Sequence, residues 1–217
     1  SASKVTREVI EAGAALKVIG RAGAGVDNID VKAATTKGIV VMNTPGGNSN
    51  AVAELTIGLM IALAREIPRG DATMKAGKWE KKTFLGVELS GKTLGLIGIG
   101  FVGSKVAAKA RGLDLKVLVH DPFVSQDECK RLGVDMVELD ALLKASDYVS
   151  LHLPRTPETI GLINAKAMAG MKRGVYLVNC ARGGIIAEAD LVAALESGQV
   201  AGAAVDVYEP EPPADWS

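Results

Sequence analysis

Short apolar runs alternate with longer amphipathic stretches along most of this chain. The runs are rich in Val, Ile and Leu and nearly continuous, which is typical of strands buried on both faces of a parallel sheet. The expected strands are 17–20, 39–42, 93–97, 115–119, 147–152, 174–179 and 200–205. The expected helices are 50–66, 103–112, 125–132, 139–145 and 187–197. This alternation predicts an α/β fold.

Composition narrows the class of partner. The 217 residues are 48% hydrophobic and carry 25 basic and 25 acidic side chains, which is typical of a soluble globular protein. No basic stripe or block of like charge is present, so we expect no nucleic acid partner and no membrane surface partner. The most apolar stretch, 55–64, is shorter than a bilayer span. The first residues show no charged-apolar-small pattern, so we expect that they are not a signal sequence. The expected partner is a small-molecule substrate.

The numbers of cysteines and histidines bear on disulfides, metal sites and the cellular compartment. Two cysteines are too few for a disulfide framework, and two histidines form no cluster at metal-ligand spacing. We therefore expect a reducing compartment, the cytoplasm by default with an organelle left open, and no metal site.

A polar excursion separates the apolar runs between Pro68 and Ser90. It carries Trp79 among lysines, and such an aromatic is more often a local packing anchor than an intersubunit contact. Because aromatic residues are enriched at protein interfaces, a dimerisation arm at about 68–90 is the alternative. The break at Pro45-Gly46-Gly47 sets the expected domains at 1–45 and 46–217.

The stretch TLGLIGIGFVGSK at 93–105 has the spacing G-x-G-x-x-G directly after an expected strand and at the start of an expected helix. Gly98 would permit the tight turn, Gly100 would let the backbone approach a pyrophosphate, and Gly103 would let the helix pack on the strand. The helix N-terminus would supply N–H groups and partial positive charge to the phosphates. This context predicts a Rossmann-type, doubly wound sheet that binds a dinucleotide.

Asp121, about 20 residues beyond the glycines, follows the next expected strand. A carboxylate there accepts hydrogen bonds from ribose hydroxyls and repels a 2′-phosphate, which favours NAD over NADP. The alternative is a structural turn followed by a solvated aspartate.

Further polar residues follow the last two expected strands, at the edge where open α/β sheets bind ligands. Arg182 could clamp a carboxylate and polarise a carbonyl, or be a surface residue at a helix start. Asp206 could cap backbone N–H groups or hold the nicotinamide side of a cofactor. Glu209 and Glu211 are expected to be solvated, and Cys180 to be a small buried residue rather than a nucleophile.

Six segments together resemble the D-2-hydroxyacid dehydrogenase family, in the order and spacing of that family. They are GRAGAGVDNID (20–30), NTPGGNSNAVAELT (43–56), GLIGIGFVG (95–103), DYVSLHLPRTPETIGLIN (147–164), VNCARGGII (178–186) and AAVDVYEPEPP (203–213). The resemblance implies that residues 1–45 are the C-terminal part of a flavodoxin-like substrate domain. It also implies a homodimer formed through the NAD-binding domain.

The resemblance also implies roles for individual residues. Arg182 would bind the substrate carboxylate and C2 oxygen, and Glu211 would support a catalytic histidine by raising its pKa. Arg21 and Gly23 would face the substrate. The residues implied to line the cofactor are Ala24, Gly98, Gly100, Phe101, Val102, Gly103, Asp121, Leu153, Pro154, Cys180, Ala181 and Asp206.

Departures from the family pattern qualify these roles. Phe101 stands where relatives often carry arginine, and Ala24 where some carry threonine. Neither His120 nor His152 matches the acid/base histidine, which in the family follows in a later segment, and each is expected to be structural or to line the cofactor. Because losing a general base costs about 100- to 10,000-fold in rate, we expect this chain to bind NAD with little or no turnover.

The expected activity of the parent enzyme is oxidation of a 2-hydroxy acid, with 3-phosphoglycerate converted to 3-phosphohydroxypyruvate for serine biosynthesis as the first candidate. Glyoxylate, hydroxypyruvate or lactate remain open as substrates. An NAD(H)-sensing corepressor-like protein is the alternative from a different class, and a corepressor would present a partner cleft in an N-terminal portion.

Overall fold

The computed structural model describes residues 3–213, and the chain divides into two compact units, one up to Asn50 and the other from Ala51 onward. The division lies inside the long helix α3 (Ser49–Ala64), slightly beyond the glycine-rich break expected to mark it. The assignment of the first unit to a substrate domain stays a prediction.

Before α3 begins, the described part of the first unit forms α1 (Arg7–Ala12), β1 (Val18–Gly20), α2 (Val31–Thr36) and β2 (Val40–Met42), and its two strands run parallel. Ile10, Ala33, Ala34 and Ile39 form its buried cluster. The Asp30 carboxylate caps α2 by accepting a hydrogen bond from the Ala33 N–H at 2.8 Å, which explains why this short helix starts there.

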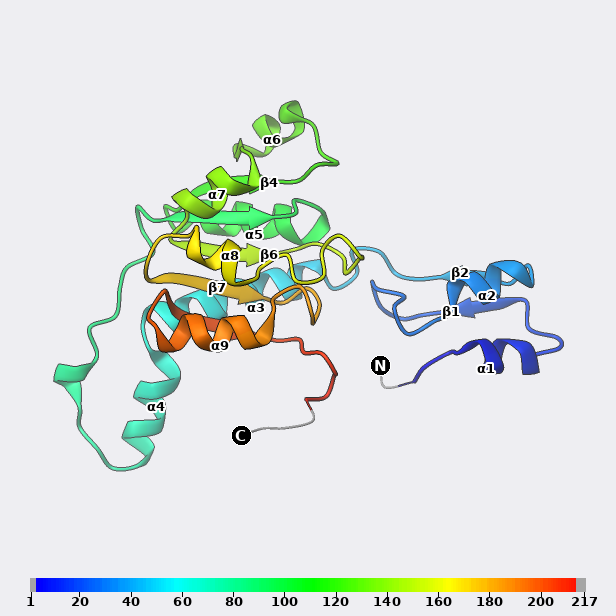
Figure 1. The fold of residues 1–217 in the computed structure, drawn as a ribbon, viewed down its shortest axis with the longest axis horizontal. Helices are drawn as coiled ribbons and strands as arrows, with labels where there is room; N and C mark the ends of the chain where they lie inside the picture. Colours follow the sequence, from blue (N-terminus) through cyan, green and yellow to red (C-terminus); the bar gives the residue numbers. More distant parts are fainter. Residues whose placement is uncertain (1–2, 214–217) are drawn as a thin grey trace. The chain divides into compact units, whose positions relative to one another are not determined.

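The second unit is built on a six-stranded parallel sheet with the order β5-β4-β3-β6-β7-β8 (Figure 1). The strands are β3 (Thr93–Ile97), β4 (Lys116–His120), β5 (Asp135–Met136), β6 (Tyr148–Leu151), β7 (Val175–Asn179) and β8 (Val200–Val205). Its chain order reverses between β3 and β6, which is the strand order of dinucleotide-binding folds. The predicted Rossmann-type sheet is confirmed.

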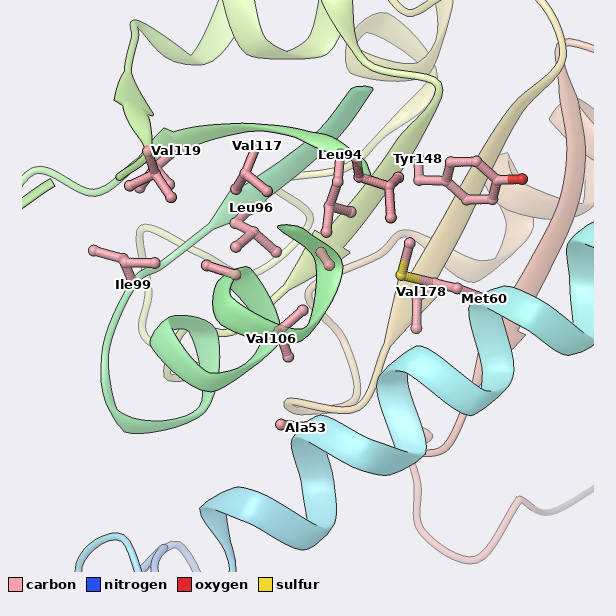
Figure 2. Close-up of a cluster of buried hydrophobic side chains, with 14 of the residues drawn as sticks. Ala53, Met60, Leu94, Leu96, Ile99, Val106, Val117, Val119, Tyr148 and Val178 are labelled. Carbon is pink, nitrogen blue, oxygen red and sulfur yellow. The ribbon is translucent and has the colours of Figure 1, made fainter. Parts of the chain in front are cut away.

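Helices cover both faces of this sheet. One cluster of buried side chains joins the sheet to α3, α5 (Phe101–Arg111) and α6 (Gln126–Leu132). The other cluster joins the opposite face to α7 (Leu139–Ala145), α8 (Ala165–Ala169) and α9 (Glu188–Glu196). Figure 2 shows the first of these, with Met60 of α3 and Val106 of α5 directed at side chains of the strands. Burial on both faces explains why the strands read as continuous apolar runs rather than alternating ones.

The polar excursion contains the helix α4 (Ile67–Lys75) and the short 3-10 helix η1 (Lys81–Thr83), and it extends away from the sheet (Figure 1). Its base is closed where the Val87 N–H donates to the Ala64 carbonyl oxygen at 2.7 Å. Trp79 is 77% exposed, so its interpretation as a local packing anchor is wrong within this chain.

No helix in the described part of the chain is both long and apolar enough to cross a bilayer.

Candidate NAD and substrate site

The glycine loop lies between β3 and α5, at the position where the strand order reverses. Gly98 has φ +95, and a Cβ on it would lie 2.3 Å from the His152 carbonyl oxygen. A Cβ on Gly103 would lie 2.3 Å from the Gly98 carbonyl oxygen. Both positions therefore require glycine for steric reasons, since real Cβ atoms do not approach backbone oxygens so closely.

Gly100 differs from the other two glycines because its missing side chain faces open space, with no atom within 4 Å of an ideal Cβ. It is the N-cap of α5, and it has no side chain to cap the first N–H groups of the helix. The helix begins at Phe101 rather than at the expected Gly103, so Phe101 and Val102 belong to its first turn. The open cradle and the uncapped helix start fit the shape and charge of a pyrophosphate.

Asp121 lies just beyond β4 and is fixed against this loop. Its Oδ2 accepts a hydrogen bond from the Ile99 N–H at 2.9 Å, and its Oδ1 accepts one from the Phe123 N–H at 2.9 Å. A carboxylate has about four acceptor positions, so each oxygen keeps capacity for a ribose hydroxyl. The residues present therefore fit the adenosine half of a dinucleotide.

Leu153 and Pro154 follow β6 and border the glycine loop through His152. The backbone N–H of His152 donates to the Ile97 carbonyl oxygen at 2.8 Å, and the His152 ring Nε2 lies 2.9 Å from the Ser150 Oγ. Burial lowers the pKa of His152 to about 4, so the ring is neutral near pH 7. His120 ends β4, and its Nδ1 lies 3.2 Å from the Val137 carbonyl oxygen.

The turn after β7 carries Cys180, Ala181 and Arg182. Asn179, which is 2% exposed, organises it: its Oδ1 accepts from the Ala181 N–H at 3.0 Å and its Nδ2 donates to the Arg182 carbonyl oxygen at 2.9 Å. The Arg182 Nη1 in turn donates to the Ala181 carbonyl oxygen at 2.7 Å. Sequence reasoning did not single out Asn179, although an asparagine at a strand end before a glycine turn is a recognisable turn signal.

Cys180 is buried, as expected. Burial raises the pKa of its thiol and the nearby Asp206 raises it further, while a hydrogen bond with Thr56 acts in the opposite direction. The thiol is therefore protonated near pH 7 and unsuited to nucleophilic attack. Thr56, fully buried in α3, is a second residue that the sequence did not reveal.

The loop after β8 carries Asp206, Glu209 and Glu211. The Asp206 N–H donates to the Asn179 carbonyl oxygen at 3.0 Å, so this loop starts beside the Arg182 turn, and the Asp206 side chain is exposed. Glu209 was expected from sequence to be solvated. Its side chain is exposed, but it also forms an ion pair, with the Glu209 Oε2 2.8 Å from the Arg155 Nη1. Glu211 is exposed.

Arg21, Gly23 and Ala24 lie after β1 in the first unit. The Arg21 Nη1 donates to the Gly25 carbonyl oxygen, and its Nε is buried with no partner among the described residues. A Cβ on Gly23 would lie 3.3 Å from the Arg21 guanidinium, so this loop is folded around the arginine. Within residues 3–213 no group of His, Cys, Asp and Glu side chains could hold a metal ion.

Comparison with known proteins places these features in a family context. Residues 57–217 match the family described as D-isomer specific 2-hydroxyacid dehydrogenase, NAD binding domain. The chain is 55% identical over 213 residues to a D-3-phosphoglycerate dehydrogenase of Archaeoglobus fulgidus, covering 98% of this chain. It spans only 40% of the length of that relative.

Solved structures of dehydrogenases and reductases also resemble this chain. A glyoxylate reductase from Paecilomyes thermophila superposes with a TM-score of 0.90 at 42% identity, covering 98% of this chain and 65% of the other. An NAD-dependent formate dehydrogenase from Staphylococcus aureus, solved in complex with NAD, gives 0.88 at 36% identity, covering 98% and 64%. These likenesses extend over both units of the chain.

Proposed function

The chain belongs to the D-isomer specific 2-hydroxyacid dehydrogenases and carries their NAD-binding domain, and from that premise we propose that it forms part of an enzyme that oxidises 3-phosphoglycerate to 3-phosphohydroxypyruvate. The observation that carries the choice of substrate is the high identity to a D-3-phosphoglycerate dehydrogenase over nearly all of this chain. Such a step would serve serine biosynthesis.

NAD, when bound, supplies the acceptor for the hydride on C2 of the substrate. We propose that the glycine loop with Phe101 and Val102 holds its pyrophosphate, and that Asp121 binds its adenosine ribose. Leu153 and Pro154 would lie beneath the adenosine, and Cys180, Ala181 and Asp206 would border the nicotinamide. Ala24 is proposed as a further cofactor contact.

Arg182 is the proposed substrate clamp. A planar guanidinium binds a carboxylate through paired N–H donors, and its charge stabilises negative charge developing on the C2 oxygen. Arg21 and Gly23 are proposed to face the substrate. Glu211 is proposed to favour the charged form of a catalytic imidazole, because a nearby carboxylate raises the pKa of histidine.

We also propose that this 217-residue polypeptide alone turns over slowly or not at all. The ring of His120 lies within hydrogen-bond distance of the Val137 carbonyl oxygen, and the ring of His152 within that distance of the Ser150 hydroxyl. Neither contact involves Arg182 or Glu211. A steady-state assay with 3-phosphoglycerate and NAD checks this point, and near-normal turnover would contradict it.

Binding tests the proposed function directly. Calorimetry should show 3-phosphoglycerate binding to the NAD complex of the wild-type chain, and Arg182→Gln should weaken that step about 10- to 100-fold by removing charge-assisted hydrogen bonds. NAD affinity should stay within about twofold, because a guanidinium that binds substrate adds little to cofactor binding. Arg173→Gln is the matched control, because the Arg173 guanidinium donates a hydrogen bond to the Ser197 carbonyl oxygen, away from the Arg182 turn.

Glyoxylate or hydroxypyruvate is the second candidate substrate, favoured by the likeness to a glyoxylate reductase. Binding of either acid to the NADH complex, with none detected for 3-phosphoglycerate, would select it. Binding of no 2-hydroxy or 2-oxo acid at all would contradict the proposed enzyme function.

We further propose a homodimer formed through the excursion at 68–90, supported by its exposed Trp79 and Leu85. A reducing compartment is proposed because Cys129 and Cys180 are both free and buried.

A further inference from the structure

Arg155 and Glu209 form an ion pair between the loops that follow β6 and β8. The Arg155 Nη1 lies 2.8 Å from the Glu209 Oε2. The backbone N–H of Glu209 also donates to the Glu188 Oε1 at 3.3 Å, at the first residue of α9. Glu209 is therefore attached through its side chain to one neighbouring loop and through its backbone to another element.

The turn that carries Arg182 packs between the Arg155 side chain and the backbone at Tyr208 and Glu209. A Cβ on Gly183 would lie 2.0 Å from the Tyr208 carbonyl oxygen, so the turn is in direct contact with the backbone that leads into Glu209. A Cβ on Gly184, which has φ +75, would lie 3.3 Å from the Arg155 Nε. The two glycines thus let the backbone beside Arg182 sit against Tyr208 on one side and the Arg155 guanidinium on the other.

The ion pair between Arg155 and Glu209 also changes the net charge beside the Arg182 turn. Without Arg155, the Glu209 carboxylate would be an unpaired negative charge within a short distance of the turn that carries Arg182. It would repel an anionic substrate that binds at this turn. Pairing with Arg155 neutralises it.

We propose that Arg155 is a positioning residue, which acts through Glu209 to hold the loop after β8 against the Arg182 turn and to neutralise the Glu209 carboxylate beside that turn. This inference rests on the proposed function in one respect only, that Arg182 binds the substrate carboxylate. The pair is partly solvated, with side chains 39% and 49% exposed, so its effect is a bias on one loop rather than a support of the whole fold.

Hydrogen exchange of the 217-residue chain tests the loop contact. In Arg155→Gln and in Glu209→Gln, the amides of Ala181, Asp206 and Glu209, which donate hydrogen bonds at this contact, should exchange about two- to fivefold faster than in the wild type, as expected for a partly exposed ion pair. The double variant should add little to either single one, because both remove the same interaction. Arg155→Lys, which keeps the charge, should retain most of the protection.

Lys172→Gln is the matched control. Lys172 pairs with Asp147 at 2.9 Å, with side chains 42% and 29% exposed, but this pair joins the segments that precede β7 and β6 rather than those that follow them. Its loss should leave exchange in the Arg182 turn unchanged. A purely general loss of stability would raise exchange in both variants.

A ligand measurement separates positioning from a merely structural role. Oxamate, a 2-oxo acid analogue, is titrated into the NADH complex while NADH fluorescence is followed. Arg155→Gln should weaken oxamate binding about two- to fivefold without changing NADH affinity, and Arg155→Lys should restore it.

Unchanged exchange at Ala181 and Glu209 in Arg155→Gln, or additive effects in the double variant, would overturn the inference. Faster exchange without any change in oxamate affinity would overturn the positioning role and leave a structural contact. If the wild type binds no NADH, or binds neither oxamate nor any other 2-hydroxy or 2-oxo acid, the proposed function fails, while the exchange result still decides whether the ion pair holds the loop.

Discussion

The Asp121 carboxylate accepts a hydrogen bond from the backbone N–H of Ile99, with the Oδ2 and N atoms 2.9 Å apart. This bond joins the loop after β4 to the glycine loop after β3. The carboxylate expected to bind ribose is thus oriented by the same backbone that is expected to bind pyrophosphate. Such preorganisation reduces the ordering cost of binding.

Gly98→Ala should destabilise the second unit. The backbone at Gly98 has φ +95, and the added Cβ would collide with the His152 carbonyl oxygen. We expect the free energy of unfolding, measured by urea titration, to fall by about 3 kcal/mol or more. A loss below about 1 kcal/mol would mean that the turn relaxes without difficulty, against the geometry described here.

Gly100→Ala should separate stability from cofactor binding. The added Cβ meets no atom within 4 Å, so the free energy of unfolding should change by only about 1 kcal/mol, the cost of alanine at an N-cap. The same Cβ would occupy the approach of the pyrophosphate, and NAD affinity measured by calorimetry should fall about tenfold or more. An unchanged NAD affinity would argue against pyrophosphate binding at this loop.

His152 should make the fold sensitive to acid. Its folded pKa is lowered by burial to about 4, below the unfolded value near 6.5, so between these values the unfolded chain binds the extra proton. Stability is therefore present above about pH 6.5 and is lost as the pH falls, by up to about 3 kcal/mol at pH 4. The loss should be smaller than this value, because His152 as a residue is half-buried and water screens part of the effect.

The measurement compares urea unfolding of the wild type and His152→Gln from pH 7 to pH 4. The variant keeps a polar partner for Ser150 but does not titrate, so the difference in unfolding free energy between the two proteins should change with pH in this window. Parallel pH profiles would assign the acid sensitivity to other groups.

Trp79→Ser should weaken the proposed homodimer. Trp79 and Leu85 are 77% and 85% exposed on the excursion, and exposed tryptophans at interfaces often contribute about 2 kcal/mol, or roughly 30-fold in dissociation constant. Val192→Ser, at a 55% exposed residue of α9, is the control. Sedimentation velocity over a concentration series reports both. A monomeric wild type would remove the dimer proposal.

The sheet could be predicted from sequence because its strands are buried on both faces. The strands 93–97 and 200–205 were expected at the bounds that the structure shows. By contrast, α4 has no buried side chain and therefore no apolar periodicity to detect. Its exposed surface carries the local pairs Glu66–Arg69 and Asp71–Lys75 instead. The two-residue strand β5 is too short to produce a pattern.

The candidate site was predicted only at the level of strand ends. The glycine spacing and Asp121 carry their own signal, since each follows an apolar run at a characteristic distance. The contacts of Asn179 and the pairing of Arg155 with Glu209 depend on how separate loops meet in space. No local pattern encodes such meetings, so Glu209 was expected to be solvated.

The most direct test of the account is calorimetric titration of NAD and NADP into the wild-type chain and into Asp121→Ala, with Asp127→Ala on α6 as the control. The wild type and the control should bind NAD, and should bind NADP at least about tenfold more weakly, because the Asp121 carboxylate repels a 2′-phosphate. Asp121→Ala should lose NAD affinity and most of this preference. Equal affinity of the wild type for the two cofactors, or no binding of either, would contradict the role proposed for Asp121 and the glycine loop.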